Sequence, residues 1–221
     1  QGYYREQIVP VQTAGLPVTD DSSIRADTTA EKLARLKPVF DRANGVITAG
    51  NASRFTDGAG AVLLGAMGAV QAHGLQPLAI VRDYLLAGVG RLETEMLLGP
   101  ALTIPKLLAR NGLDFGAIGV WEIHEAFATQ VLINRQCMAS RDFIDQRFGR
   151  EFPCGEIPLE KLNTWGGSLA LGNPFAATGV RLLHTAAQRL QKENQRYAVV
   201  ATCAGGGLGA ALLLENPAAL S

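Results

Sequence analysis

The chain has 221 residues, of which 48% are hydrophobic and 18% charged, and its 20 Lys and Arg residues balance 20 Asp and Glu residues. This length predicts one large folded domain, or one domain with an appendage, and the zero net charge gives no reason to expect nucleic acid or an anionic membrane as a partner. The three cysteines, Cys137, Cys154 and Cys203, have neither disulfide nor zinc-site spacing, which indicates a reducing compartment.

The first part of the chain predicts few and short elements. A capping box, Thr28-x-x-Glu31, predicts a helix that Pro38 breaks or kinks. Residues 45–70 are small and apolar, which is consistent with a buried strand and then a short helix. A further strand is predicted at residues 78–82.

The rest of the chain alternates strands and helices. Its predicted elements, in chain order, are a helix at 103–111 closed by Gly112, a strand at 118–123, a helix at 126–137, a charged irregular stretch at 140–161, a glycine-rich loop at 163–174, a helix at 176–192, and strands at 198–202 and 210–215 around a turn at 203–209. This alternation indicates an α/β layered fold. Two long uncharged stretches, 58–81 and 197–214, are interrupted by glycines, so we expect neither to span a membrane.

Three well-known motifs are approached but not completed. Residues 205–210 (GGGLGA) fit the relaxed dinucleotide fingerprint, but too little chain follows for its helix and acidic residue. Residues 124–128 (HEAFA) begin the zinc-protease pattern H-E-x-x-H and end in alanine. Residues 166–170 (GGSLA) resemble a hydrolase nucleophile elbow, yet no acidic residue lies between them and His184, the one later histidine.

Three polar residues remain at places where strands end or glycine loops turn, namely His124, Asn173 and Cys203. Each has an ordinary interpretation: a capping or core histidine, a turn or N-cap asparagine, and a small buried thiol. Together, however, each lies beside flexible backbone or a helix N-terminus, where a thiolate or an oxyanion is stabilised. We therefore interpret the three as one candidate site.

The chain resembles the C-terminal part of a thiolase at five ordered motifs. They are residues 50–59 (GNASRFTDGA), 98–106 (LGPALTIPK), 124–127 (HEAF), 163–179 (NTWGGSLALGNPFAATG) and 203–209 (CAGGGLG). The corresponding family patterns are G-N-[SA]-S-x-x-[ST]-D-G-A, G-P-x-x-A-x-x-K, [NH]-E-A-F, N-x-x-G-G-x-[IL]-A-x-G-H-P-x-G-x-[ST]-G and C-x-G-x-G. His124, where asparagine is commoner, and the long segment 140–161 look most like the fatty-acid β-oxidation branch related to trifunctional-enzyme β-subunits.

The resemblance implies a two-step Claisen chemistry on coenzyme A thioesters. Cys203 matches the family's second cysteine, the acid/base that moves the proton at the α-carbon; we expect nearby dipoles to lower its pKa from about 8.5. His124 matches the residue that orients an oxyanion-hole water. Three glycines, Gly172, Gly205 and Gly207, are expected to support the site by letting backbone approach the thioester enolate.

Two departures from the family matter for activity. The family's nucleophilic cysteine lies in an N-terminal half that these 221 residues do not include, so we expect the chain by itself to be inactive. Asn173 stands where the G-H-P motif has its catalytic histidine. An asparagine donates a hydrogen bond but accepts no proton, which would remove general-base assistance of about 10²–10⁴-fold.

The resemblance also implies an architecture. We expect residues 1–44 to be part of the family's loop domain and residues 45–64 to form a strand and loop of the N-terminal half. Residues 65–221 would then form the C-terminal domain, a βαβαβαββ half of a layered αβαβα fold. Such a half should expose the apolar face that packs on its twin.

The leading hypothesis is a 3-ketoacyl-CoA thiolase of fatty-acid β-oxidation, for which this chain supplies the acid/base half of the site. The alternative is a catalytically degenerate thiolase-fold subunit that binds acyl-CoA or a partner chain, and a ketoacyl synthase of the same fold is disfavoured because it lacks the glycine turn after Cys203. We expect acyl-CoA and CoA as substrates, no cofactor and no metal. We also expect a homodimer or homotetramer, association with a multifunctional β-oxidation α-subunit, no nucleic-acid partner, and a location in the bacterial cytoplasm or, in a eukaryote, the mitochondrial matrix.

Overall fold

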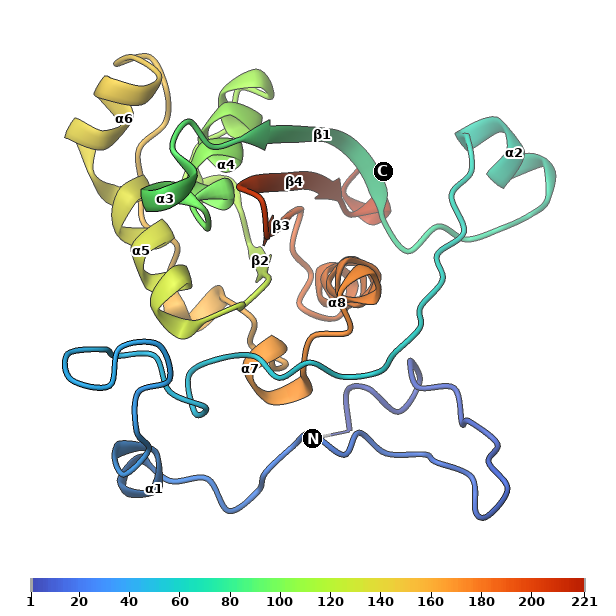
Figure 1. Ribbon diagram of the computed structural model, residues 1–221. Coiled ribbons are helices and arrows are strands. Elements are labelled where there is room, and N and C mark those ends of the chain that lie inside the picture. The colour runs from blue at the N-terminus through green and yellow to red at the C-terminus, as the bar shows by residue number, and fades with distance from the viewer. Residues whose placement is uncertain (1, 221) are drawn as a thin grey trace.

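The computed structural model describes residues 2–220, and its centre is one four-stranded mixed sheet (Figure 1). The strand order is β1 (Ile80–Gly88), β4 (Leu208–Glu215), β3 (Tyr197–Ala204), β2 (Val120–Ile123). β3 and β4 form an antiparallel hairpin, β1 pairs antiparallel with β4, and β2 runs parallel to β3. All four residues of β2 are buried, because helices cover both faces of the sheet there.

Three helices form the two layers around the sheet. α4 (Gly99–Arg110) and α5 (Ala128–Ala139) cover one face, where Ile104 and Met138 meet Val199 of β3 in the larger core. α8 (Ala176–Lys192) covers the other face and presents Leu182, Ala186 and Leu190 at a spacing of four residues to the sheet (Figure 1). The α/β layered fold predicted from the sequence is therefore confirmed.

Shorter elements connect these layers. They are the helices α1 (Ala30–Ala34), α2 (Met67–Ala72), α3 (Leu92–Glu95), α6 (Arg141–Arg147) and α7 (Ser168–Leu171), and the 3₁₀ turns Phe115–Ala117, Leu159–Lys161 and Pro217–Leu220. None of the helices among residues 2–220 is both long enough and apolar enough to cross a membrane.

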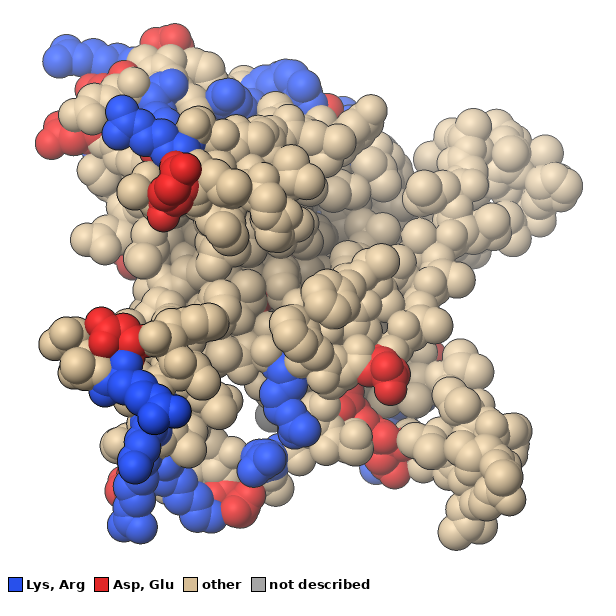
Figure 2. All heavy atoms as spheres, viewed as in Figure 1, with Lys and Arg blue, Asp and Glu red and all other residues tan. Residues whose placement is uncertain are grey.

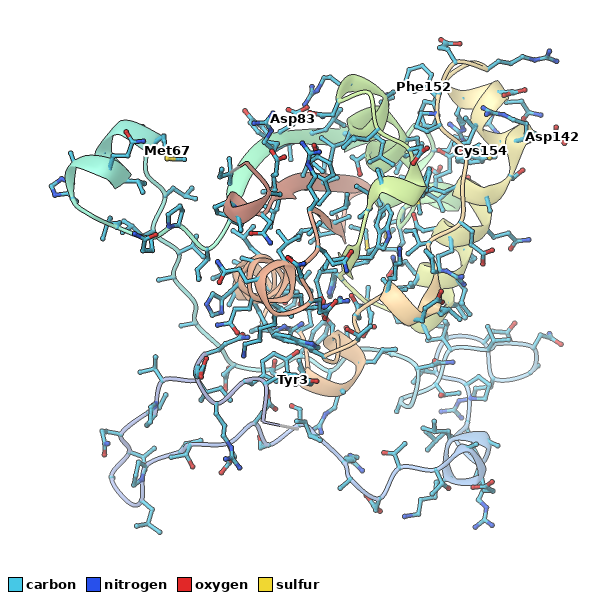
Figure 3. All side chains as sticks on the ribbon, turned by 180° about the vertical axis from the view of Figure 1, so that it is seen from behind. Tyr3, Met67, Asp83, Asp142, Phe152 and Cys154 are labelled. Atoms are coloured by element: carbon cyan, nitrogen blue, oxygen red, sulfur yellow. The ribbon has the colours of Figure 1, made fainter. Side chains whose placement is uncertain are left out.

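The N-terminal residues lie below α7 and α8 and contain little regular structure (Figure 1). Tyr3 stacks on Trp165, with ring centroids 4.4 Å apart, and the Tyr4 hydroxyl donates to the Gly166 carbonyl at 3.1 Å (Figure 3). These contacts fasten the start of the chain to the glycine-rich loop. Figure 2 shows that few charged side chains lie on the central face over α8 or on the projecting α2.

Several sequence predictions are wrong in detail. The first helix begins one residue later, because Thr29 rather than Thr28 is its N-cap and accepts from the Lys32 N–H at 3.3 Å. The described residues form no strand within residues 45–64, and residues 57–65 are exposed. Because the expected neighbours of that strand belong to the N-terminal half, the strand stays a prediction. The short helix that follows it is confirmed as α2.

Two further differences lie between β2 and β3. The stretch predicted to be irregular contains α6, which Ser140 caps by accepting from the Phe143 N–H at 3.2 Å. The five strands of the expected βαβαβαββ order reduce to four in the described sheet. Where the missing strand would lie, Leu162 forms a single parallel bridge with Trp121, and the left-handed Asn163 (φ 47°) then ends the pairing.

Candidate active site

His124 and Cys203 lie at the carboxyl ends of neighbouring parallel strands. His124 follows directly after β2, and its N–H donates to the Ala201 carbonyl of β3 at 2.9 Å, which continues the ladder by one residue. Cys203 is the penultimate residue of β3. Ligand sites in α/β sheets form at this edge of the strands.

Cys203 is buried on the α4 side of the sheet. Side chains alternate along β3, so Cys203 shares a face with Val199 and Ala201, which belong to the core under α4. Burial raises the pKa of the Cys203 thiol to about 11. The expectation that dipoles would lower this pKa is therefore wrong, because removing the thiolate from water outweighs them.

The turn after Cys203 depends on glycine at some positions only. Gly206 and Gly207 have φ of 89° and 76°, and a Cβ on Gly207 would come within 2.5 Å of a Val89 methyl carbon. At Gly205 the backbone has ordinary φ and open space. The turn itself thus requires glycine at 206 and 207 and not at 205, and the expected approach of this backbone to the enolate stays a prediction.

The N-terminus of α4 packs directly against this turn. A Cβ on Gly99 would lie 2.5 Å from the Gly209 Cα, and Gly209 pairs with Cys203 across the hairpin. Only two glycines allow the backbones to approach so closely. The G-P motif of residues 98–106 therefore brings a helix start against the β4 residue that pairs with Cys203.

The His124 ring is held by a buried serine. Its Nδ1 lies 2.9 Å from the Ser168 Oγ, and the Arg181 Nη2 donates to the same oxygen at 2.7 Å. Burial, and after it the positive charge of Arg181, lower the pKa of His124 to about 4. The imidazole is therefore neutral at pH 7.

Glu125 and Asn163 join the end of β2 to the glycine-rich loop. The Glu125 carboxylate accepts from the Asn163 side-chain amide at 2.6 Å and from the Leu169 N–H at 2.9 Å. The Asn163 amide also bonds both backbone groups of Ile123, at 2.8 and 2.9 Å. A Cβ on Gly167 would overlap the Glu125 carboxylate, so this close packing requires the glycine.

Asn173 forms a turn just before α8, whose N-cap residue is Phe175. Its Oδ1 accepts from the Thr178 hydroxyl at 2.8 Å and from the Phe175 N–H at 3.1 Å, and its backbone N–H donates to the Arg54 carbonyl at 2.7 Å. The preceding Gly172 has φ 87° and packs on Thr56. Of the two ordinary interpretations of Asn173, the turn residue describes its contacts and the N-cap is wrong, because the N-cap position belongs to Phe175.

The structure brings two of the three candidate loops together. Arg181 donates to the Gly172 carbonyl at 2.9 Å as well as to Ser168, so it connects the backbone before Asn173 with the residue that holds His124. Among residues 2–220, no hydrogen bond joins Cys203 to either of the other two candidates. Sequence reasoning missed Ser168 and Arg181, although both lie in or directly after the motif at 163–179.

A largely apolar cavity of about 310 Å³ lies beside Phe127, three residues after His124. The residues that line it come from the loop around Phe40 and Ile47, from α3 and the residues after it, and from the start of α5; they include Met96, Leu97, Phe127 and Ile133. Phe127 belongs to the H-E-A-F segment. Its ring packs edge to face with that of Phe40, and the ring centroids are 6.1 Å apart. In the described part of the chain no cluster of three His, Cys, Asp or Glu side chains could hold a metal ion.

Comparisons with known proteins agree with the motifs. Two family models match, "Thiolase, N-terminal domain" over residues 1–67 and "Thiolase, C-terminal domain" over residues 75–216. A probable 3-ketoacyl-CoA thiolase of Caenorhabditis elegans is 46% identical over 211 residues, covering 94% of this chain and 47% of that protein. The mitochondrial trifunctional enzyme subunit beta of Bos taurus is 44% identical over 209 residues, covering 94% of this chain and 44% of that protein.

Solved structures give the same result. Human mitochondrial 3-ketoacyl-CoA thiolase superposes with a TM-score of 0.83 at 32% identity, over 98% of this chain and 50% of that one. The dimeric peroxisomal thiolase of Saccharomyces cerevisiae superposes with a TM-score of 0.82 at 35% identity, over 97% and 50%. The chain therefore spans about half the length of the relatives it matches.

Proposed function

Because this chain belongs to the thiolase family, we propose that the protein containing it cleaves 3-ketoacyl-CoA thioesters with coenzyme A, giving acetyl-CoA and a shortened acyl-CoA. The observation that carries the proposal is the placement of His124 and Cys203 at the same end of two neighbouring strands, inside family motifs. The names of the relatives, 3-ketoacyl-CoA thiolase and trifunctional enzyme subunit beta, support the same reaction.

Cys203 is suited to donate a proton in the degradative direction. Burial keeps its thiol protonated at neutral pH, since the pKa is raised to about 11. When the bond between the α-carbon and the 3-keto carbon breaks, the departing acetyl group is an enolate. The Cys203 S–H transfers its proton to that carbon, which leaves a thiolate and acetyl-CoA.

His124 is suited to stabilise the enolate oxygen. A neutral imidazole donates one hydrogen bond, either directly or through a water, and a fixed donor lowers the barrier most where negative charge develops. The buried Ser168 fixes the ring orientation before substrate arrives. We propose that His124 supplies this donor and that the neutral ring acts as a hydrogen-bond donor and not as an acid.

The apolar cavity beside Phe127 is the proposed site for the acyl chain. Its walls include the residues before α4, which lead into Gly99 at the Cys203 turn, and the start of α5, which follows His124. A volume of about 310 Å³ is in the range of small-molecule sites. The proposal names CoA thioesters as substrates, with no cofactor, metal or nucleic acid.

The proposed assembly and location follow the relatives. One solved relative is described as dimeric and another relative is a mitochondrial trifunctional-enzyme subunit. We propose a dimer or tetramer that associates with a multifunctional β-oxidation α-subunit, in the bacterial cytoplasm or, in a eukaryote, the mitochondrial matrix.

The test is thiolysis by the full-length protein containing this chain, followed as acetyl-CoA formation by mass spectrometry. The Cys203→Ala variant should form no acetyl-CoA, whereas Cys137→Ala, which changes a thiol on α5 away from the strand ends, should keep the wild-type rate. A second candidate function, acyl-CoA binding without turnover, is favoured by one observation: the Asn173 oxygen is occupied by hydrogen bonds from the Phe175 N–H and the Thr178 hydroxyl. Acyl-CoA binding by calorimetry, with no acetyl-CoA formed, would establish that alternative.

A further inference from the structure

Arg181, Ser168 and His124 form a buried chain of hydrogen bonds in which the direction of each bond can be assigned. An arginine only donates, so the Arg181 Nη2–H must point to the Ser168 Oγ at 2.7 Å. The Ser168 hydroxyl then has one hydrogen left to donate. Ser168 is completely buried, and its one other side-chain partner in the described chain is the His124 Nδ1 at 2.9 Å.

From this geometry we propose that Ser168, oriented by Arg181, positions His124 as the tautomer with its proton on Nε2. Ser168 donates to Nδ1, so Nδ1 carries the lone pair, and a neutral imidazole then carries its hydrogen on the other nitrogen. Ser168 and Arg181 are positioning residues, because they act on the reaction only through the His124 ring.

The free Nε2 is the group available to a ligand. In the described chain it has no hydrogen-bond partner, and it is not one of the fully buried polar atoms that lack one. It therefore retains access to solvent. The positive charge of Arg181 also disfavours a second proton on the ring, which would turn the neutral donor into an imidazolium. The other ionisable groups near Arg181 are Tyr4, Asp21, Glu122 and Glu125.

The Arg181 guanidinium thus contacts both the backbone before Asn173 and the serine that holds His124. Its Nη1 donates to the Gly172 carbonyl at 2.9 Å, while its Nη2 sets the direction of the Ser168 hydroxyl. The catalytic use of the Nε2–H, as a donor to the enolate oxygen or its water, rests on the proposed function. The tautomer itself does not.

The test is long-range ¹H–¹⁵N correlation spectroscopy on the full chain labelled at histidine, which has three histidines, His73, His124 and His184. In the wild type, Nδ1 of His124 should resonate as an unprotonated nitrogen and Nε2 as a protonated one. A wild-type spectrum with the proton on Nδ1 overturns the proposal without any variant. Because no turnover is involved, this result is independent of thiolase activity.

Three variants separate positioning from mere packing. Ser168→Ala should shift His124 toward a mixture of tautomers, while Ser168→Thr, which keeps the hydroxyl, should retain the wild-type signals. Ser140→Ala removes a serine that caps α6 instead, and should leave His124 unchanged. If Ser168→Ala does not fold, the wild-type and Ser168→Thr spectra still decide the assignment.

Kinetics give a second measure in the full-length protein. Ser168→Ala should lower kcat by about 10–100-fold with little change in KM, less than the 10²–10³-fold expected for loss of a whole oxyanion donor. The same change in a His124→Asn background should have little effect, because no ring remains to be oriented. Equal Ser168→Ala effects in both backgrounds would overturn the positioning role.

Discussion

Replacement of Asn173 by histidine should increase the turnover of the full-length protein. Asn173 occupies the place of the family's catalytic histidine, and its side chain is half-buried at the start of α8. A histidine there can accept a proton from the nucleophile, which asparagine cannot do. General-base assistance is worth about 10²–10⁴-fold, or about 3–5 kcal/mol of barrier.

The same replacement should lower the stability. The Asn173 oxygen accepts from the Thr178 hydroxyl and the Phe175 N–H, and loss of these hydrogen bonds costs about 1 kcal/mol. The Tm of the full-length protein should therefore decrease. Faster turnover together with a lower Tm is a combination that general stabilisation of the fold could not produce.

The assay compares kcat for 3-ketoacyl-CoA thiolysis with Tm from calorimetry in three variants. Asn173→His should be faster and less stable than the wild type. Asn173→Gln keeps an amide and gains no base, so its kcat should not rise. Thr178→Val removes the hydroxyl that donates to Asn173 without changing position 173. Equal kcat for the histidine and asparagine proteins, both folded, would refute the reasoning.

Three further predictions concern the thiol, the pH dependence and the glycine contact. Alkylation of Cys203 by iodoacetamide, followed by peptide mass spectrometry, should be slow at neutral pH and accelerate toward pH about 11; rapid neutral reaction would contradict the buried thiol. The pKa of His124 is lowered to about 4 in the folded state, so the unfolded chain binds more protons between that pH and about 6.5. The free energy of unfolding, measured with urea, should therefore fall as the pH decreases from about 6.5 to about 4. Relative to His124→Asn, the loss should be at most about 3 kcal/mol. Gly99→Ala should destabilise the chain by about 1–3 kcal/mol, because its Cβ would overlap Gly209, whereas Gly68→Ala, in a helix with open space, should be neutral or stabilising; equal free energies of unfolding would argue against the contact.

The sequence predicted best those elements whose signal is local. The helix expected at 176–192 has those bounds in the structure, because its apolar spacing and the preceding glycine loop mark both ends. The α6 helix was missed although Ser140 with Asp142 in the first turn and Arg147 in the last is a recognisable pattern. The strand at 45–64 stays a prediction, because a strand needs a neighbour and its expected neighbours belong to the N-terminal half.

The properties of the site depended more on contacts between distant residues. The place of His124 after a strand could be predicted from the sequence, but its bond to Ser168 joins residues 44 positions apart. The direction of the Cys203 pKa was wrong for the same reason, since the burial of a thiol is set by the elements packed around it. The contacts of Asn173 could be predicted, because its hydrogen bond from the Phe175 N–H is local and follows an ordinary turn pattern.

Because Trp165 stacks on Tyr3, the two tryptophans of the chain report on two different parts of the molecule. The chain has two tryptophans. Trp121 is completely buried in the sheet core and stacks on Phe115, while Trp165 stacks on Tyr3 at the start of the chain. Replacing either tryptophan with phenylalanine leaves a single emitter. The fluorescence of Trp165 then reports detachment of the N-terminal residues from the glycine-rich loop, and the fluorescence of Trp121 reports unfolding of the sheet. The two events can therefore be followed separately in time.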